Sequence, residues 1–389
     1  MRVLFTSFAY VPETSGVPIV VKYLAEGLAS HGHTVTVATR TNGKKLPYQE
    51  MINGVDVHRF NIYQSLLKKD LGDTERYISF VIGAPKDVLV LECVQCQTTD
   101  ILLPYLSSMN CRIVLHSHGG PGIHQKFFQW NTNVFHTIGN TFNWFRWKKY
   151  YGRTLPMYSD MIDLVICLSL CASDLEYMNS HMKRVAIVEN ASEEMFFQFK
   201  GKSEQIDLPI GINAKDYILC IANYVPNKDQ VEIVRAFEKI RESDCALVLI
   251  GSKKNKYYDY VLKEANRVSS KSKKKIYALA GINRTLLPKV LGNARLFVMA
   301  SHHEEYPVSL VEAMSMGVPF LSTDVGCARI LPGGVTVSNR GDLALYMDYL
   351  ISHPEMLSRL GNQGFKYAES NNRLDKVISL FENYLIQDS

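Results

Sequence analysis

The chain has 389 residues, of which 47% are hydrophobic and 21% charged, and its formal net charge is +5. This length is typical of two domains, each able to bury its own core. No apolar run approaches the roughly 20 residues of a membrane-spanning helix, and so small a positive charge does not indicate a nucleic-acid-binding protein.

The amino terminus and the cysteines indicate a protein of the cytoplasm. Residues 1–16 read as a strand and a loop, without the basic stretch and long apolar run of a signal peptide, so we expect none. Most of the eight cysteines lie in apolar runs, where a free thiol behaves as a small hydrophobic group. Cys93 and Cys96 form one CxxC pair without the second pair that a zinc site needs, so we expect reduced thiols.

The first half of the chain shows the pattern of a parallel sheet. An apolar strand at 3–6 precedes a turn-rich loop containing Gly16, and apolar residues then recur at helical spacing until Gly32. A strand around Val35 and Val37 completes a β-loop-α-β unit. Further apolar strands are expected at 88–91, 112–116 and 164–168.

The pattern restarts after a polar stretch at 191–216, which we interpret as a linker. A strand at 217–222 and an amphipathic helix at 230–240 open the second half. Further strands are expected at 246–250, 275–279, 296–299 and 319–322. We therefore predict an α/β fold of two Rossmann-like domains, 1–190 and 191–370. Parallel sheets of this kind bind ligands at the carboxyl ends of their strands, and facing sheets would form a cleft between the domains.

The stretch 301–314 carries the strongest indication of chemistry. Glu304 lies in a loop after a strand, and Glu312 lies in the early turns of a helix that opens at about Pro307. The N–H groups of such a helix start suit a diphosphate, and a carboxylate one or two turns later can accept both hydroxyls of a ribose. Taken alone, the two glutamates are better explained as a loop charge and a charge favoured by the helix dipole.

At this point the sequence resembles the family 4 retaining glycosyltransferases, which have the GT-B fold. Glu304 and Glu312 match the E-x7-E motif of that family. Other segments resemble it in the same order: GHTVTV at 32–37, ENAS at 189–192, IANYVPNK at 221–228, and GVP followed by STDVG at 317–326. The resemblance spans nearly the whole chain, and it implies that a final helix within 371–389 crosses back to the first domain.

The resemblance implies a role for each matching residue. Glu312 would bind the ribose hydroxyls, Glu304 would contact the donor sugar, and Lys228 would neutralise the departing diphosphate. His118 would contact the donor sugar near the reacting carbon, and Gly16 would let the backbone approach the phosphate. The other donor-binding positions are Asn223, Tyr306, Pro307 and Val308.

The resemblance also implies the reaction. A sugar would pass from a nucleotide-sugar donor to a glycan or lipid-linked acceptor with retention of configuration, in surface-polysaccharide or glycolipid synthesis. A fixed ammonium and helix dipoles can stabilise the leaving group, so no metal and no cofactor are expected. The second domain would bind mainly the donor and the first domain mainly the acceptor.

Three positions depart from the family pattern. Asn223 replaces an arginine that contacts phosphate, Glu305 stands where glycine is common, and Ser15 replaces the first glycine of a pair. The charge missing at Asn223 keeps a second interpretation open, a catalytically silent partner that binds a sugar or another transferase. A nicotinamide-dependent dehydrogenase is disfavoured, because no GxGxxG follows the first strand.

Two histidine-containing segments are not expected to bind metal. His116 and His118 are two apart along a strand, so their side chains would point to opposite faces of the sheet. The adjacent loop residues at 302–305 have no further ligands with zinc-like spacing.

The segment 126–153 is both basic and aromatic, and it contains all three tryptophans of the chain. Tryptophan and tyrosine beside lysine and arginine suit a membrane interface. A helix whose aromatic side chains pack into the first domain is an equally good interpretation. In the first case the protein would sit at the cytoplasmic face of the membrane.

Overall fold

The computed structural model describes residues 1–13, 16–64, 70–127, 134–198, 217–241 and 245–387. The chain divides into two compact units. Unit 1 comprises Met1–Glu189 with Val377–Ser389, and unit 2 comprises Asn190–Lys376. Each contains one mainly parallel sheet between helices, which confirms the predicted α/β class. The second half of the predicted linker, 199–216, lies outside the described residues.

Unit 1 contains an eight-stranded sheet in the order β10-β9-β8-β7-β1-β2-β4-β3. All neighbouring pairs are parallel except β3 and β4. The chain builds outward from β1 on one side and then returns to β7 on the other, so the topological switch point lies between β1 and β7. The strands are β1 (Arg2–Ser7), β2 (Thr34–Arg40), β3 (Gln49–Ile52), β4 (Val55–Phe60), β7 (Val88–Glu92), β8 (Arg112–His116), β9 (Leu164–Cys167) and β10 (Val185–Ile187). A separate hairpin joins β5 (Ile62–Gln64) to β6 (Asp70–Gly72).

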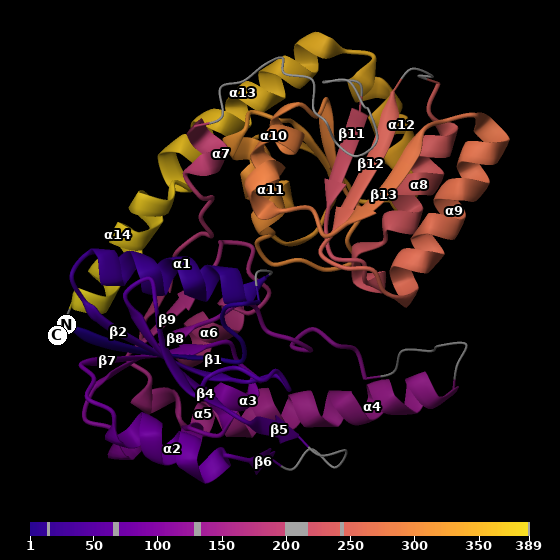
Figure 1. Ribbon diagram of the computed structural model, residues 1–389. Helices are drawn as coiled ribbons and strands as arrows, with labels where there is room; N and C mark the ends of the chain where they lie inside the picture. The colour runs from indigo at the N-terminus through magenta and orange to yellow at the C-terminus, as the bar shows by residue number, and fades with distance from the viewer. Residues whose placement is uncertain (14–15, 65–69, 128–133, 199–216, 242–244, 388–389) are drawn as a thin grey trace. The chain divides into compact units, whose positions relative to one another are not determined.

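Helices α1 (Val17–Ser30) and α14 (Leu374–Ile386) cover one face of this sheet, and α2 (Thr74–Gly83) lies on the other, as Figure 1 shows. A Cβ on Gly27 of α1 would lie 2.2 Å from the Ile378 side chain of α14, so this side chain packs directly on the backbone of α1. Phe381 of α14 is fully buried and stacks on Phe5 at 6.2 Å between ring centroids. The final helix therefore returns to the unit that holds the first strands, as the sequence predicts.

The remaining helices of unit 1 include α4 (Val134–Lys149), which extends beyond the sheet in Figure 1. Trp147 of α4 packs against Gly122, whose added Cβ would lie 2.1 Å from the indole. Phe142 and Phe145 are instead 70% and 58% exposed. The packing interpretation thus holds for Trp147, and membrane contact stays a prediction for the exposed rings. Trp130 lies outside the described residues. The shorter helices are α3 (Gln97–Asp100), α5 (Leu155–Met157) and α6 (Leu175–His181).

Unit 2 contains a six-stranded parallel sheet in the order β13-β12-β11-β14-β15-β16. Its switch point lies between β11 and β14, because the chain builds toward β13 and then returns to the other side of β11. The strands are β11 (Tyr217–Ile221), β12 (Ala246–Gly251), β13 (Ile276–Ala280), β14 (Leu296–Met299), β15 (Phe320–Thr323) and β16 (Gly334–Val337).

Helices cover both faces of the second sheet. Val231, Val234 and Phe237 recur every three residues along α8 (Gln230–Lys239) and are buried, which explains why this helix packs on the sheet. Figure 1 shows α8 and α9 (Lys256–Ser272) on one side and α10 (Leu287–Gly292) and α11 (Val308–Ser315) on the other. The unit also contains α7 (Met195–Gln198), α12 (Leu343–Ile351) and α13 (Pro354–Asn371).

The described parts of the chain contain neither a disulfide nor a membrane-spanning helix. None of the eight cysteines, all of which are described, forms a disulfide, and Cys167, Cys220, Cys245 and Cys327 are buried. Across the same ranges, every helix is too short or too polar to cross a lipid bilayer.

Candidate active site

The switch point of unit 2 brings Lys228 and Glu304 together. Lys228 ends a 3-10 turn after β11, and Glu304 lies in the loop after β14. Because β11 and β14 are neighbours, both loops leave the sheet at the same edge. The Lys228 ammonium forms an ion pair with the Glu304 carboxylate, which also accepts a hydrogen bond of 2.6 Å from Ser301 Oγ. Both side chains are mostly shielded from solvent, with 23% and 11% exposed.

Hydrogen bonds tie these two loops to each other. The backbone N–H of His302 donates to the carbonyl of Asn227 at 2.8 Å, and the Asn227 side chain donates to the carbonyl of His303 at 2.9 Å. The turn between Lys228 and α8 needs a left-handed residue, and Asp229 adopts that conformation with φ of 44°. These hydrogen bonds therefore hold the loop of Lys228 next to the loop of Glu304.

A third loop closes over the same site through Gly326. A Cβ at this position would lie 2.5 Å from the carbonyl oxygens of Glu304 and Glu305, and its φ is 52°. Only glycine fits both the conformation and the contact. The next residue, Cys327, donates its N–H to the Glu305 carbonyl at 3.1 Å, so the STDVG segment holds the backbone of the Glu304 loop.

Glu312 lies inside α11, 2% exposed, with Arg284 as its ion-pair partner at 2.5 Å. Burial raises the pKa of this carboxyl, although the Arg284 charge acts in the opposite direction. The helix starts after Pro307, where no side chain caps the first N–H groups. Its amino end therefore points donors and a partial positive charge toward the loop of Glu304.

The acidic Glu305 has its own partner. His303 Nε2 lies 3.2 Å from its carboxylate, and this hydrogen bond raises the pKa of His303. The negative charge of Glu305, which departs from the family pattern, is thus shared with the imidazole of His303.

The other predicted donor residues of unit 2 lie around the same edge. Tyr306 is buried, and its hydroxyl accepts a hydrogen bond of 3.1 Å from Asn372 while its carbonyl accepts one of 2.8 Å from Asn190. The buried ring of Tyr306 therefore supports the loop from the interior of the unit, and the backbone of Tyr306 is the part that adjoins Glu305. Asn223 follows β11 and is half-buried, Pro307 is buried, and Val308 is half-buried at the first turn of α11.

Gly16 lies at the corresponding place in unit 1. It precedes α1 as the N-cap, it is exposed, and its φ of 63° is left-handed. Nothing within 4 Å would meet a Cβ there, so the backbone conformation alone favours glycine. Ser15 lies outside the described residues.

The predicted arrangement of His116 and His118 is wrong. Their rings lie 4.4 Å apart, and both face the carboxylate of Glu92, with His118 Nε2 at 2.7 Å and His116 Nδ1 at 3.1 Å. Strand alternation does not apply, because β8 ends at His116 and the chain bends before His118. The three groups lie close enough together to hold a metal ion, so the geometric argument against a metal there fails. The two short contacts are equally hydrogen bonds from imidazole N–H groups to a carboxylate.

Sequence reasoning missed Glu92 and Arg284. Glu92 is the last residue of β7 and fully buried, so a charged end to an apolar strand at the carboxyl edge was the available signal. Arg284 follows β13, and its link to Glu312 depends on two loops folding together. No local pattern marks it.

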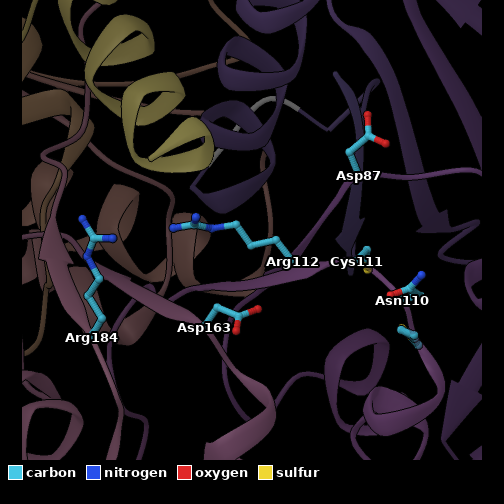
Figure 2. Close-up of a pocket in the computed structure, with 7 residues that line it drawn as sticks. Asp87, Asn110, Cys111, Arg112, Asp163 and Arg184 are labelled. Atoms are coloured by element: carbon cyan, nitrogen blue, oxygen red, sulfur yellow. The ribbon is translucent and has the colours of Figure 1, made fainter. Parts of the chain in front are cut away.

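A pocket of about 570 Å³ in unit 1 is not part of this site. It lies at the amino ends of the strands, where Asp87 precedes β7 and Arg112 begins β8 (Figure 2). Figure 2 shows the side chain of Arg112 extending toward the carboxyl-terminal helix, where its guanidinium donates to the Tyr384 carbonyl at 3.1 Å. The arginine therefore caps the end of α14. The other lining residues are Met109, Asn110, Cys111, Asp163 and Arg184.

Known proteins share this fold and sequence pattern. A family described as Glycosyl transferases group 1 matches residues 203–367. An uncharacterized glycosyltransferase of Methanocaldococcus jannaschii is 24% identical over 353 residues, which cover 84% of this chain and 81% of that protein. The GPI3 subunit of the phosphatidylinositol N-acetylglucosaminyltransferase of Saccharomyces cerevisiae is 20% identical over 340 residues, 84% of this chain and 69% of the subunit. The crystal structure of Anabaena HepE in complex with UDP and glucose superposes with a TM-score of 0.70 at 13% identity, covering 99% of both chains.

The matched segment holds Lys228, Glu304 and Glu312, so the site described above lies inside it. The chain has the GT-B fold, and the match of its segment 203–367 together with these relatives makes it similar to the group 1 glycosyltransferases.

Proposed function

We propose that the enzyme transfers a sugar from a nucleoside diphosphate sugar to a lipid-linked or glycan acceptor, with retention of configuration and without a metal. One observation carries the proposal: a half-buried lysine–glutamate pair lies at the switch point of unit 2, and its glutamate lies in the loop directly before the amino end of α11. That edge is where open parallel sheets bind ligands. A solved neighbour was crystallised with UDP and glucose, which supports a donor of this class.

The charges suit the departure of a diphosphate. Breaking the bond between sugar and phosphate builds negative charge on the leaving oxygen, and an ammonium and a helix amino end both stabilise it. Lys228 is a cation at this place in unit 2, and Asn223 adds none. We therefore expect Lys228 to leave Glu304 for the diphosphate, and Glu304 to accept a hydroxyl of the donor sugar.

The acceptor side of the proposal rests on unit 1. His118, held by Glu92 at the carboxyl edge of the first sheet, is the group that we assign to the sugar near the reacting carbon. On α4, the exposed rings of Phe142 and Phe145 are followed by the cations Arg146, Lys148 and Lys149. Exposed aromatic rings beside cations suit the headgroup region of an anionic membrane, so we propose a lipid-linked acceptor taken from the cytoplasmic leaflet.

A donor screen tests the reaction. We expect the parent chain to bind one of UDP-, GDP- and ADP-sugars and to hydrolyse it slowly, releasing the sugar first in the anomeric configuration of the donor. Chelation with EDTA should leave this rate unchanged. Glu312→Ala should weaken donor binding at least about tenfold, since it removes a charged hydrogen-bond acceptor. Lys271→Ala, which removes an exposed lysine of α9, is the matched control. A parent that binds no donor overturns the proposal, and loss of activity in EDTA overturns its metal-independence.

Vesicle sedimentation tests the membrane contact. We expect the chain to sediment with vesicles of phosphatidylcholine and phosphatidylglycerol and to stay in solution with phosphatidylcholine alone. The double variant Phe142→Ser, Phe145→Ser should lose this binding while its melting temperature stays unchanged, because both rings are exposed. Equal sedimentation of the parent and the variant would contradict the contact.

A further inference from the structure

Three linked charges lie beside the proposed donor-binding helix of unit 2, and one of them, Glu312, is buried. Arg284 Nη2 lies 2.5 Å from Glu312 and 2.5 Å from Glu193, and Arg284 Nε donates to Glu193 at 2.6 Å. The guanidinium lies 5.5 Å from the ring centroid of Phe196, a buried residue of α7. One cation therefore joins two carboxylates from different parts of the sequence.

The two carboxylates differ in their surroundings. Glu312 has 3% of its side chain exposed and Glu193 has 24%. A carboxyl as buried as Glu312 loses the hydration that keeps it ionised, and the charge of Glu193 acts in the same direction. The positive charge of Arg284 opposes both effects, because it lowers the pKa of Glu312. On its other side, α11 meets α13 through Met314 and Gly364, which carry no charge.

The charge of Glu312 matters for what it can bind. An ionised carboxylate accepts hydrogen bonds on both oxygens, so it can take both hydroxyls of a ribose, whereas a protonated carboxyl gives up part of that capacity. Glu193 holds the guanidinium of Arg284 in place, and the guanidinium in turn fixes the rotation of the Glu312 carboxylate. A lysine could supply the charge without this geometry.

We infer that Arg284 is a positioning residue of the donor site, which keeps Glu312 ionised and oriented for the ribose hydroxyls, with Glu193 as its anchor. This inference rests on the proposed function, since it needs a nucleotide at α11. Under this inference, recognition of the ribose also depends on Arg284 and Glu193, which touch neither the sugar nor the phosphate.

Nucleotide binding as a function of pH tests the inference. The probe is whichever of UDP, GDP and ADP the parent binds most tightly, together with its 2′,3′-dideoxy form, which lacks the two hydroxyls. In the parent, we expect the natural nucleotide to bind better than the dideoxy form at every pH from 6 to 9. In Arg284→Gln this preference should fall at least about tenfold at pH 7, the size expected for hydrogen bonds to a charged group. It should recover as the pH is raised, because loss of the Arg284 charge raises the pKa of Glu312 further and the carboxyl ionises again only above that pKa.

Two further variants make the result specific. Arg284→Lys keeps a cation and should lose the preference only in part, and Glu193→Gln should weaken it less than Arg284→Gln does. Arg235→Gln, which removes an arginine paired with Glu264 on the outer helices, should change nothing.

The outcomes are distinct. If Arg284→Gln weakens both nucleotide forms equally at every pH, Arg284 has only a structural role and the inference is wrong. The inference is also wrong if the variant keeps the parent's preference. If the parent binds none of the three nucleotides, the proposed function fails and the inference fails with it.

Discussion

Glu92 shows how burial and neighbouring charge compete at a single residue. Complete burial alone raises the pKa of this carboxyl, but His116 and His118 outweigh burial and lower the pKa from 4.5 to about 2. A carboxyl with a lower pKa in the folded than in the unfolded chain stabilises the fold above the unfolded value. That contribution is lost as pH falls through the folded value.

We therefore expect Glu92→Gln to change how stability depends on pH. The parent should be more stable than the variant at neutral pH. The difference in the free energy of unfolding should narrow by about 2 kcal/mol between roughly pH 5 and pH 3, as the shift of the carboxyl pKa implies. Urea unfolding of both chains across this range measures it. Parallel curves would show that Glu92 is not held ionised by the two histidines.

At the same scale, the sequence predicts some site residues and not others. Lys228, Glu304 and Glu312 each lie in a segment that resembles a family motif, so their grouping could be expected. Arg284 and Glu193 are 91 positions apart and meet only because two loops fold together. The prediction for His116 and His118 was wrong because the alternation of a strand was extended two residues beyond the end of β8.

Among the elements, α14 contributes most clearly to the stability of unit 1, although the rest of that unit is distant from it in sequence. Phe381 is fully buried, between Phe5 of β1 and His116 of β8. The neighbouring Leu380 is 42% exposed on the same helix. These two positions form a matched pair for testing the packing of the helix.

Phe381→Ala should lower the free energy of unfolding by about 3–5 kcal/mol, the usual cost of removing a buried aromatic ring. Leu380→Ala should lower it by less than about 1 kcal/mol, because much of that side chain is already in water. Thermal and urea unfolding of the two variants checks both values. Similar losses in the two variants would contradict the packing of α14 against β1.

Prediction of the elements from sequence succeeded where apolar runs are long. Five strands of each sheet follow from hydrophobic runs, namely β1, β2, β7, β8 and β9 in unit 1 and β11, β12, β13, β14 and β15 in unit 2, whereas α14 was expected from the family resemblance. The hairpin of β3 and β4 was missed, since β3 alternates exposed and half-buried residues instead of forming an apolar run. Its turn at Asn53 and Gly54, with φ of 47° and 84°, is a sequence signal for a two-residue hairpin that could have been used.

For the whole molecule, the order of the strands explains where chemistry can occur. Each unit has a switch point, and polar or flexible residues lie at the ends of the strands beside it. Gly16 follows β1 and Glu92 ends β7 in unit 1, and Lys228 and Glu304 follow β11 and β14 in unit 2. Sequence spacing predicted parallel sheets, but it could not give the order of their strands, because pairing is decided by contacts between distant residues. The nucleotide base, the sugar and the acceptor depend on loop shapes and have no signal of this kind.

The central claim is that the diphosphate of the donor binds between Lys228 and the amino end of α11. Titration calorimetry of the nucleoside diphosphate that binds best, and of its nucleoside, tests it directly in the parent and in Lys228→Ala. We expect the variant to lose at least about tenfold in affinity for the diphosphate, as removal of a charged hydrogen-bond donor does, and to bind the nucleoside as the parent does. Equal affinity of both chains for the diphosphate would place the phosphates elsewhere and contradict the account.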